Sequence, residues 1–408
     1  MTSDKNTQLK FPKGFLWGTA TAGHQVEGKN IHSDWWAWEK SRKDIENSGI
    51  ACDHYHLYKK DFSLIKEVLH NNAYRFSIEW ARIEPKEGKF NKKEVEHYRN
   101  VLNELSRLRI KSMVTLHHFV NPLWFSEKGG WEKKENIKYF ERFVNLCIKE
   151  FGQDIDYWIV VNEPNIYISM AYIKGGWPPG KKSLLTAIKV YCNLAHAHKS
   201  AYKLIHDTFP NAKVSSAIHM SAFKYMNIFD KPLSDLSNYL FSYSFIFLTK
   251  GYHDFIGVNY YALHLTKFSD IFYKSIKVEE YEKLVKGKVN DLGWPIYPKG
   301  IYEVTRQVWK RYKLPIIITE NGTADAHEPN RIKFLVNHIK WLQSAIKDGV
   351  DIRGYFYWSL MDNFEWHLGK GVRFGLFETD YRTLKRIPRK SAEVFGKIAQ
   401  TNSIPTNL

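Results

Sequence analysis

Pro315-Ile-Ile-Ile-Thr-Glu-Asn-Gly322 and Asp156-Tyr-Trp-Ile-Val-Val-Asn-Glu-Pro164 share one pattern, an apolar and β-branched run that ends on a glutamate. Such a run is too short for an isolated helix, and its composition favours a strand that is buried on both faces, as in parallel sheets. Glu163 and Glu320 would then stand where the buried strands end. The two stretches therefore predict a parallel sheet with two carboxylates at its carboxyl-terminal edge.

Six further apolar, strand-like runs occur along the chain. The complete set of predicted strands covers residues 15–20, 73–78, 111–116, 157–161, 213–218, 255–258, 315–319 and 353–358. Their starts are spaced by roughly 40 to 60 residues, which leaves room for a strand, a helix and two loops in each unit. Between them, segments such as Ile137–Ile148 carry apolar residues at spacings of three and four, as amphipathic helices do.

Eight alternating strand and helix units favour a closed (β/α)8 barrel of the α/β class. The rival architecture, an open doubly wound sheet, would require a glycine-rich phosphate turn after an early strand, and no G-x-G-x-x-G motif is present. No linker or shift in composition divides the chain. We therefore expect one catalytic barrel domain over residues 1–408, with a frayed polar tail at about residues 401–408.

The composition narrows the class of protein. Hydrophobic residues make up 44% and charged residues 25% of the chain, as in soluble globular proteins. No apolar window of about 18 residues is present and Met1–Lys10 is polar, so we expect no transmembrane span, no secretory signal and a cytoplasmic location. Cys52, Cys147 and Cys192 are widely spaced and match no metal-ligand pattern. We expect them to be reduced, and we expect neither a metal nor a cofactor.

The net charge of +17 raises the possibility of a nucleic-acid partner. Basic residues are, however, spread through segments that also carry acids, rather than clustered in one run. The charge therefore predicts solubility and non-specific binding, with no specific nucleic-acid function. The sequence does not indicate an oligomeric state.

Hydrogen-bonding and aromatic side chains follow the ends of the predicted strands, where barrels place their active sites. In chain order these residues are Gln25, Arg75, His117, His118, Asn162, Glu163, Asn259, Tyr260, Tyr261, Glu320, Asn321, Trp358, Glu365 and Trp366. Sugar rings stack their C–H faces on flat aromatic rings, so Trp358 and Trp366 predict a carbohydrate site. Two facing carboxylates can break a glycosidic bond, one as acid and the other as nucleophile or base.

These motifs resemble glycoside hydrolase family 1, a family of retaining β-glucosidases and β-glycosidases. In chain order, the stretches that carry the resemblance are Phe11–Gly28, Tyr74–Ile83, Asn162-Glu-Pro164, Thr319-Glu-Asn-Gly322, Tyr355–Trp366 and Arg373–Leu376. The resemblance covers nearly the whole chain. It implies a (β/α)8 barrel that hydrolyses small β-glycosides and short β-linked oligosaccharides.

The resemblance also implies a role for each matching residue. Glu163 would be the general acid/base and Glu320 the nucleophile, with Arg75 and Tyr261 beside Glu320. Trp294 would line the aglycone side. The residues that would bind the glycone are Gln25, His118, Asn162, Glu365 and Trp366, with Trp358 as the floor beneath the sugar ring.

The implied roles agree with elementary chemistry. A guanidinium and a phenol next to Glu320 would favour its ionised form, as a nucleophile requires. Glu163 must hold a proton in the first half-reaction and act as a base in the second. One pair of carboxylates could then serve both steps.

Some alternatives stay open at this stage. A 6-phospho-β-glycosidase of the same family would carry a small residue in place of Glu365, and a non-catalytic sugar-binding barrel would not need both Glu163 and Glu320. The sequence does not rank glucose, galactose and fucose as glycone. Many family members carry Trp-Asp-Leu-Pro where this chain has Phe119-Val-Asn-Pro122. The segment between Tyr261 and Trp294 is short for the family and predicts an open aglycone cleft.

Overall fold

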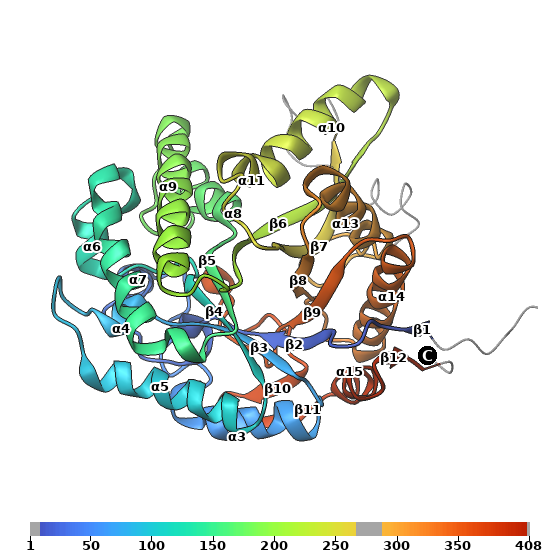
Figure 1. Ribbon diagram of the computed structural model, residues 1–408, viewed down its shortest axis with the longest axis horizontal. Coiled ribbons are helices and arrows are strands. Elements are labelled where there is room, and N and C mark those ends of the chain that lie inside the picture. Colours follow the sequence, from blue (N-terminus) through green and yellow to red (C-terminus); the bar gives the residue numbers. More distant parts are fainter. Residues whose placement is uncertain (1–8, 267–287, 406–408) are drawn as a thin grey trace, which may run out of the picture.

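The computed structural model describes residues 9–266 and 288–405, and it is built around a closed barrel of eight parallel strands (Figure 1). The barrel strands are β2 (Leu16–Ala20), β3 (Ala73–Ser77), β4 (Lys111–His117), β5 (Tyr157–Asn162), β6 (Val214–Tyr225), β7 (Ile256–Thr266), β8 (Ile316–Asn321) and β9 (Ile352–Trp358). The ring closes because β2 pairs with both β3 and β9, so that Ala20 lies opposite Arg75 on one side and Trp358 on the other. The predicted barrel and all eight predicted strands are confirmed.

Helices surround the barrel (Figure 1). The longer ones are α3 (His54–Glu67), α5 (Lys92–Arg107), α7 (Ile137–Phe151), α9 (Leu184–Thr208), α13 (Lys299–Tyr312), α14 (Glu328–Lys347) and α15 (Lys390–Thr401). The shorter ones are α1 (Gly23–Val26), α2 (Asp34–Ser41), α4 (Trp80–Ile83), α6 (Leu123–Glu127), α8 (Pro164–Ile168), α10 (Lys231–Asn238) and α11 (Ser244–Leu248). Single turns are η1 (Gly130–Glu132), η2 (Lys134–Asn136), η3 (Gly152–Asp154), η4 (Ser169–Ile173), η5 (Ile228–Asp230), η6 (Tyr239–Tyr243) and η8 (Trp366–Leu368).

Helix α7 shows how the apolar spacing attaches a helix to the barrel. Its buried side chains are Ile137, Phe140, Phe143, Val144, Cys147, Ile148 and Phe151. Residues three and four apart lie on one face of a helix, so this set forms a single apolar stripe that faces the core. The predicted helical periodicity is confirmed.

Strands β6 and β7 continue beyond the barrel. The sequence pattern ends them at Ile218 and Val258, but they run on to Tyr225 and Thr266, and residues 222–225 pair with residues 263–266. Burial in this extension of β7 alternates from residue to residue. The continuous apolar run that marks a fully buried strand is therefore absent there, and the prediction stopped too early.

The two ends of the described chain pair with each other. Strand β1 (Leu9–Lys10) pairs with β12 (Ser403–Ile404) in antiparallel fashion, and both residues of β12 are buried. The expected frayed tail is therefore wrong for Ser403 and Ile404, because pairing satisfies their backbone; residues 406–408 lie outside the described part. Strands β10 (Phe377–Asp380) and β11 (Lys385–Pro388) form a separate hairpin.

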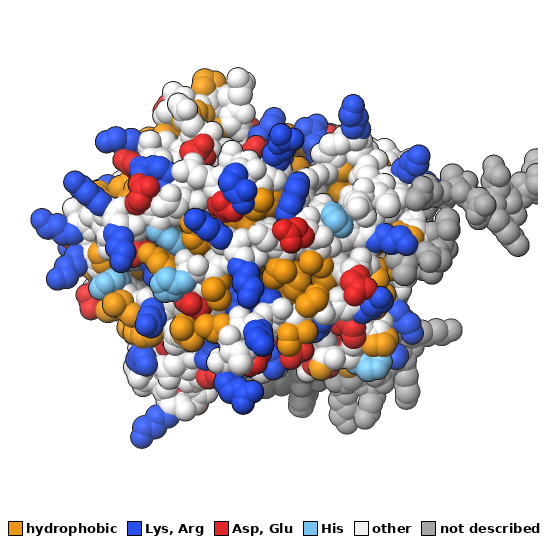
Figure 2. Space-filling model, turned by 90° about the horizontal axis from the view of Figure 1, so that it is seen from below, with side chains coloured by type: hydrophobic (Ala, Val, Ile, Leu, Met, Phe, Trp, Pro, Cys, Tyr) orange, Lys and Arg blue, Asp and Glu red, His pale blue; other side chains and the backbone are white. Residues whose placement is uncertain are grey.

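Charged side chains are dispersed on the face shown in Figure 2, where Lys and Arg alternate with acidic and apolar groups. On this face the basic side chains therefore do not gather in a single patch. Within residues 9–266 and 288–405, no helix is long and apolar enough to cross a membrane.

Candidate active site

A cavity of about 680 Å³ opens at the carboxyl-terminal ends of the barrel strands. Nine of the predicted site residues line it, namely His118, Asn162, Glu163, Tyr261, Trp294, Glu320, Trp358, Glu365 and Trp366. Gln25 and Arg75 are buried directly behind this lining and hydrogen-bond to Glu365 and Glu320. The fold thus brings the whole predicted set together from separate strands.

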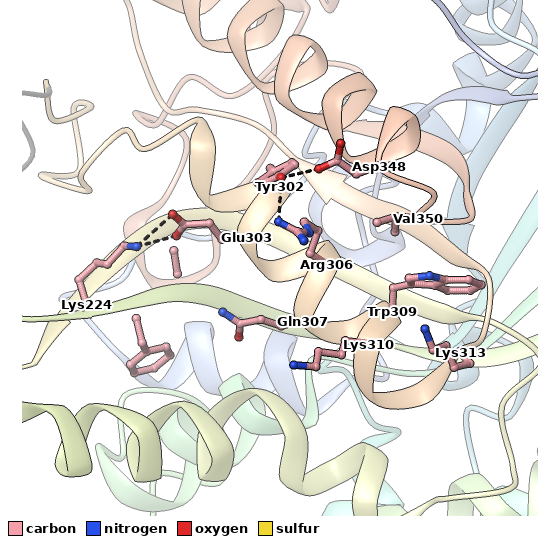
Figure 3. Close-up of a pocket in the computed structure, with 12 residues that line it drawn as sticks. Lys224, Tyr302, Glu303, Arg306, Gln307, Trp309, Lys310, Lys313, Asp348 and Val350 are labelled. Atoms are coloured by element: carbon pink, nitrogen blue, oxygen red, sulfur yellow. Dashed lines mark hydrogen bonds and ion pairs between the residues drawn. The ribbon is translucent and has the colours of Figure 1, made fainter.

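A second hollow of about 520 Å³ lies between β6 and α13 (Figure 3). Lys224 of β6 pairs with Glu303 of α13 at 2.8 Å, and Arg306, Lys310 and Lys313 line the same hollow. None of the predicted site residues lines it. The hollow is therefore separate from the candidate active site.

Glu320 is the penultimate residue of β8 and lies between two hydrogen-bond donors. Arg75 Nη1 lies 2.5 Å from Oε1, and the Tyr261 hydroxyl donates to Oε2 at 2.6 Å. Burial raises the pKa of Glu320 to about 7; Arg75 and Tyr261 oppose this rise, and the charge of Glu163 adds to it. A buried guanidinium and a phenol therefore both stabilise the carboxylate form of Glu320 against the effect of burial.

Glu163 follows β5 in a left-handed backbone conformation, with φ of 43°. A side chain other than glycine rarely adopts this conformation, and such residues concentrate at functional sites. Asn259 Nδ2 donates to Glu163 Oε1 at 2.8 Å, and His219 Nδ1 lies 3.1 Å from the same oxygen. Oε2 has no hydrogen-bond partner among the described residues.

Asn162 connects the surroundings of the two carboxylates. Its Oδ1 accepts from Arg75 Nη2 at 2.6 Å and from Asn259 Nδ2 at 3.1 Å, so its Nδ2 must face His118 Nε2, at 3.2 Å. His118 Nε2 therefore accepts, which leaves the proton of the neutral ring on Nδ1. Burial, with Arg75 adding to it, lowers the pKa of His118 well below its usual value. Its Nδ1 has no partner among the described residues and is a donor available to a ligand.

Gln25 and Glu365 form a second polar group in the cavity. Gln25 Nε2 donates to Phe364 O at 2.8 Å, to Asn363 Oδ1 at 3.0 Å and to Glu365 Oε2 at 3.2 Å, while Gln25 Oε1 is buried without a partner in the described chain. Burial raises the pKa of Glu365 to about 8, and the charge of Glu320 contributes to the rise. In its protonated form the Glu365 carboxyl can both donate to and accept from a hydroxyl.

The chain matches the family model described as glycosyl hydrolase family 1 over residues 7–230 and 242–404. It belongs to this family. Beta-glucosidase A of Thermotoga maritima is 32% identical, over 97% of this chain and 99% of that protein. The beta-galactosidase of Pyrococcus woesei is 30% identical, over 98% of each chain. The solved beta-glycosidase from Pyrococcus horikoshii has a TM-score of 0.90 and 38% identity, over 98% of this chain and 97% of that one.

The predicted family and the predicted enzyme class are therefore confirmed, and the protein is a β-glycosidase.

Aromatic rings of this family 1 enzyme lie next to the polar groups of its cavity. The ring of His118 stacks on Trp358 at 5.8 Å and on Trp366 at 6.2 Å, and Trp366 also packs against Trp177 at 5.6 Å. Trp294 is 36% exposed and packs against Tyr261 at 5.9 Å, at the outer part of the cavity.

Gly322 allows the backbone after β8 to approach β9. A Cβ atom at this position would lie 1.8 Å from the Trp358 carbonyl oxygen, so the Thr319-Glu-Asn-Gly322 motif of the glycosidase requires glycine. Asn321 of the same motif is held by Tyr260 O at 2.7 Å and the Tyr355 hydroxyl at 2.8 Å. It supports the strand end and does not line the cavity.

His117 is a structural neighbour of His118, as expected. Its Nε2 lies 3.2 Å from Asn121 Oδ1, and it does not line the cavity. Phe119, in the stretch that differs from many family members, does line the cavity, and its ring packs against Trp177 at 4.9 Å.

Sequence reasoning missed several cavity residues of the glycosidase. Of these, His219 stands directly after the predicted strand of residues 213–218, a signal equal to that of His117 after the third strand. Trp177 lies in a connection without periodicity, His367 lies in the single turn η8, and Phe374 lies within the Arg373–Leu376 motif, to which no site role was given. The Trp177 indole nitrogen donates to His367 Nδ1 at 2.9 Å.

Proposed function

We propose that this family 1 enzyme is a retaining exo-β-glycosidase that removes terminal, non-reducing β-D-glucosyl residues and related galactosyl and fucosyl residues by double displacement. The contrast between the two carboxylates carries the proposal. Glu320 is held by Arg75 and Tyr261 as a carboxylate, whereas Glu163 accepts hydrogen bonds on Oε1 and keeps Oε2 available for a proton.

In the first half-reaction, Glu320 attacks the anomeric carbon while Glu163 gives its proton to the departing glycosidic oxygen. A covalent glycosyl ester of Glu320 forms, and the aglycone leaves as an alcohol. In the second half-reaction, Glu163 removes a proton from water, and the resulting oxygen nucleophile displaces Glu320 from the sugar. The residue roles are those expected from the sequence.

The glycone would lie on Trp358, with its hydroxyls reached by the free polar atoms of the cavity. These atoms are His118 Nδ1 as a donor and the carboxyl of Glu365, with Gln25 Oε1 as an unpartnered acceptor just behind the lining. Asn162 and Trp366 line the same end. Small β-glycosides and short β-linked oligosaccharides fit a cavity that holds one sugar firmly.

A 6-phospho-β-glycosidase is the alternative within the family. The carboxyl side chain of Glu365 occupies the position that would have to accommodate the phosphate, which disfavours this alternative. A non-catalytic sugar-binding barrel is disfavoured by the intact surroundings of Glu163 and Glu320. Cys52, Cys147 and Cys192 are all unpaired, which supports the proposal of a reducing, cytoplasmic location.

Proton NMR of the first sugar released from a β-glucoside tests the mechanism. We expect the β-anomer, because two inversions at one carbon restore its configuration. Initial release of the α-anomer would contradict double displacement. Aryl β-glucoside, galactoside, fucoside and 6-phosphoglucoside substrates assayed in parallel would rank the glycones.

A further inference from the structure

The outer wall of the active-site cavity carries a cation that the proposed reaction does not use. Lys174 follows η4, lines the cavity and is exposed to solvent. The only acidic residues in the lining are Glu163, Glu320 and Glu365, which form the catalytic and glycone-binding groups. Among the described residues, Lys174 has no carboxylate within ion-pair distance.

Two imidazoles lie close to this lysine. His264, on the extension of β7, and His367, on the loop after β9, both line the cavity. Partial burial lowers the pKa of the His367 ring, and the charge of Lys174 lowers it further, whereas the side chain of His264 is exposed. Lys174 thus shares the lining of one cavity with both imidazoles, and each ring in its neutral form can serve as a hydrogen-bond donor.

We propose that Lys174 forms a subsite for an anionic group, such as a carboxylate, on the aglycone of a β-glycoside. This subsite deepens the proposed function and depends on it. An anion at this position would form an ion pair with the Lys174 ammonium and would remain partly hydrated.

The depth of the cavity distinguishes the aglycone from the glycone. Asn162, Glu320 and His118 are at most 4% exposed and lie at its floor, where the sugar ring reacts. Lys174 is exposed, so it lies where the group attached to the sugar emerges. The net charge of +17 would add a long-range attraction for anionic substrates.

The test compares two substrates, the β-D-glucosides of 3-(4-hydroxyphenyl)propanoate and of its primary amide. The two phenols are equally good leaving groups because two methylene groups separate the ring from the charge. We expect kcat/KM for the carboxylate to exceed that for the amide by about fivefold at low ionic strength and to approach it as salt screens the pair. Lys174→Met should abolish the preference and Lys174→Glu should reverse it.

Lys182→Met is the matched control, since Lys182 belongs to the same connection but does not line the cavity. It should retain the preference. A ratio near one in the unchanged enzyme, or a ratio unaffected by Lys174→Met, would overturn the proposal. If Lys174→Met affected only a glucoside phosphorylated at O6, the lysine would act on the glycone and the proposal would also fail. Turnover of the neutral amide tests the proposed glycosidase function separately.

Discussion

At the level of single side chains, Tyr261 and Arg75 stabilise the carboxylate form of Glu320, the proposed nucleophile. The phenol donates to Glu320 at 2.6 Å and lowers a pKa that burial raises to about 7. Burial also keeps the pKa of Tyr261 well above its ordinary value, so the phenol remains a donor. The fraction of enzyme with ionised Glu320 therefore depends on this hydrogen bond near neutral pH.

Tyr261→Phe should shift the acidic limb of the pH profile of kcat/KM toward higher pH. Loss of the donor raises the pKa of Glu320, so a higher pH is needed to ionise it, and a shift of about one unit corresponds to ~1.4 kcal/mol. The profile of an aryl β-glucoside measures this shift. Tyr302→Phe, outside the cavity, is the control. An unchanged acidic limb in Tyr261→Phe would show that the phenol does not govern Glu320.

His219 Nδ1 lies 3.1 Å from Oε1 of Glu163, the proposed acid, and we expect the tautomer that donates to this oxygen. His219→Phe removes this donor and should lower kcat/KM about tenfold for an alkyl β-glucoside, which needs a proton on its leaving group. The 2,4-dinitrophenyl β-glucoside should lose little, because its leaving group departs unaided. His219→Asn, which can place an N–H at a similar distance from the backbone, should restore part of the alkyl rate.

Equal losses for both substrates would assign His219 a merely structural role.

The sequence could have identified His219 as a site residue from its position at a strand end, but it could not have identified the partner of this side chain. Which oxygen of Glu163 accepts from His219 depends on the register of β5, β6 and β7, and no local pattern specifies that register.

Strands β8 and β9 were predicted from the sequence, but the contacts between strands were not. Apolar runs predicted both strands, because a strand buried on both faces has an unambiguous composition. Their close approach at Gly322 depends on tertiary packing, and so does the pairing of β6 with β7 beyond the barrel. The sequence therefore did not predict those strand ends that depend on pairing with a neighbouring strand.

Gly322→Ala should destabilise the protein and lower activity together. The added Cβ would meet the Trp358 carbonyl at 1.8 Å, and a backbone atom cannot yield without moving the end of β9. We expect a loss of about 3 kcal/mol in the free energy of unfolding, with a fall in kcat/KM because Glu320 and Trp358 both shift. Thermal unfolding and aryl glucoside turnover measure the two effects. Gly371→Ala is the control, as nothing lies within 4 Å of its Cβ position; equal stability of both variants would contradict the close approach.

The sequence predicts the architecture of the whole molecule, but it does not predict how the loops at the rim of the cavity fold. Eight repeated units and one chain of matching motifs predicted the barrel and its family. The predicted open aglycone cleft concerns the segment between Tyr261 and Trp294, and residues 267–287 of it lie outside the described part. That feature remains a prediction, since loop length alone does not determine how a loop folds over a cavity.

Asn402 joins the two ends of the chain to the base of the barrel. Its Nδ2 donates to the carbonyls of Phe11 and Pro12 at 2.9 and 3.2 Å, and its Oδ1 accepts from the indole of Trp17 at 2.9 Å. Its backbone is left-handed, with φ of 49°, a conformation that asparagine tolerates better than most residues. One side chain therefore holds the amino-terminal segment, the first barrel strand and the end of α15 together.

Asn402→Ala should lower the free energy of unfolding by about 3 kcal/mol, because three hydrogen bonds of about 1 kcal/mol each are lost. Asn402→Gly loses the same bonds but relieves the left-handed backbone, so it should be less destabilised than the alanine variant by up to about 1 kcal/mol. Urea unfolding followed by tryptophan fluorescence measures both, with Asn103→Ala on the exposed face of α5 as the control. Because the contacts lie at the end of the barrel opposite the cavity, kcat/KM at moderate temperature should stay unchanged in all three variants. Stability equal to the unchanged protein in both Asn402 variants would show that the chain ends do not depend on this side chain.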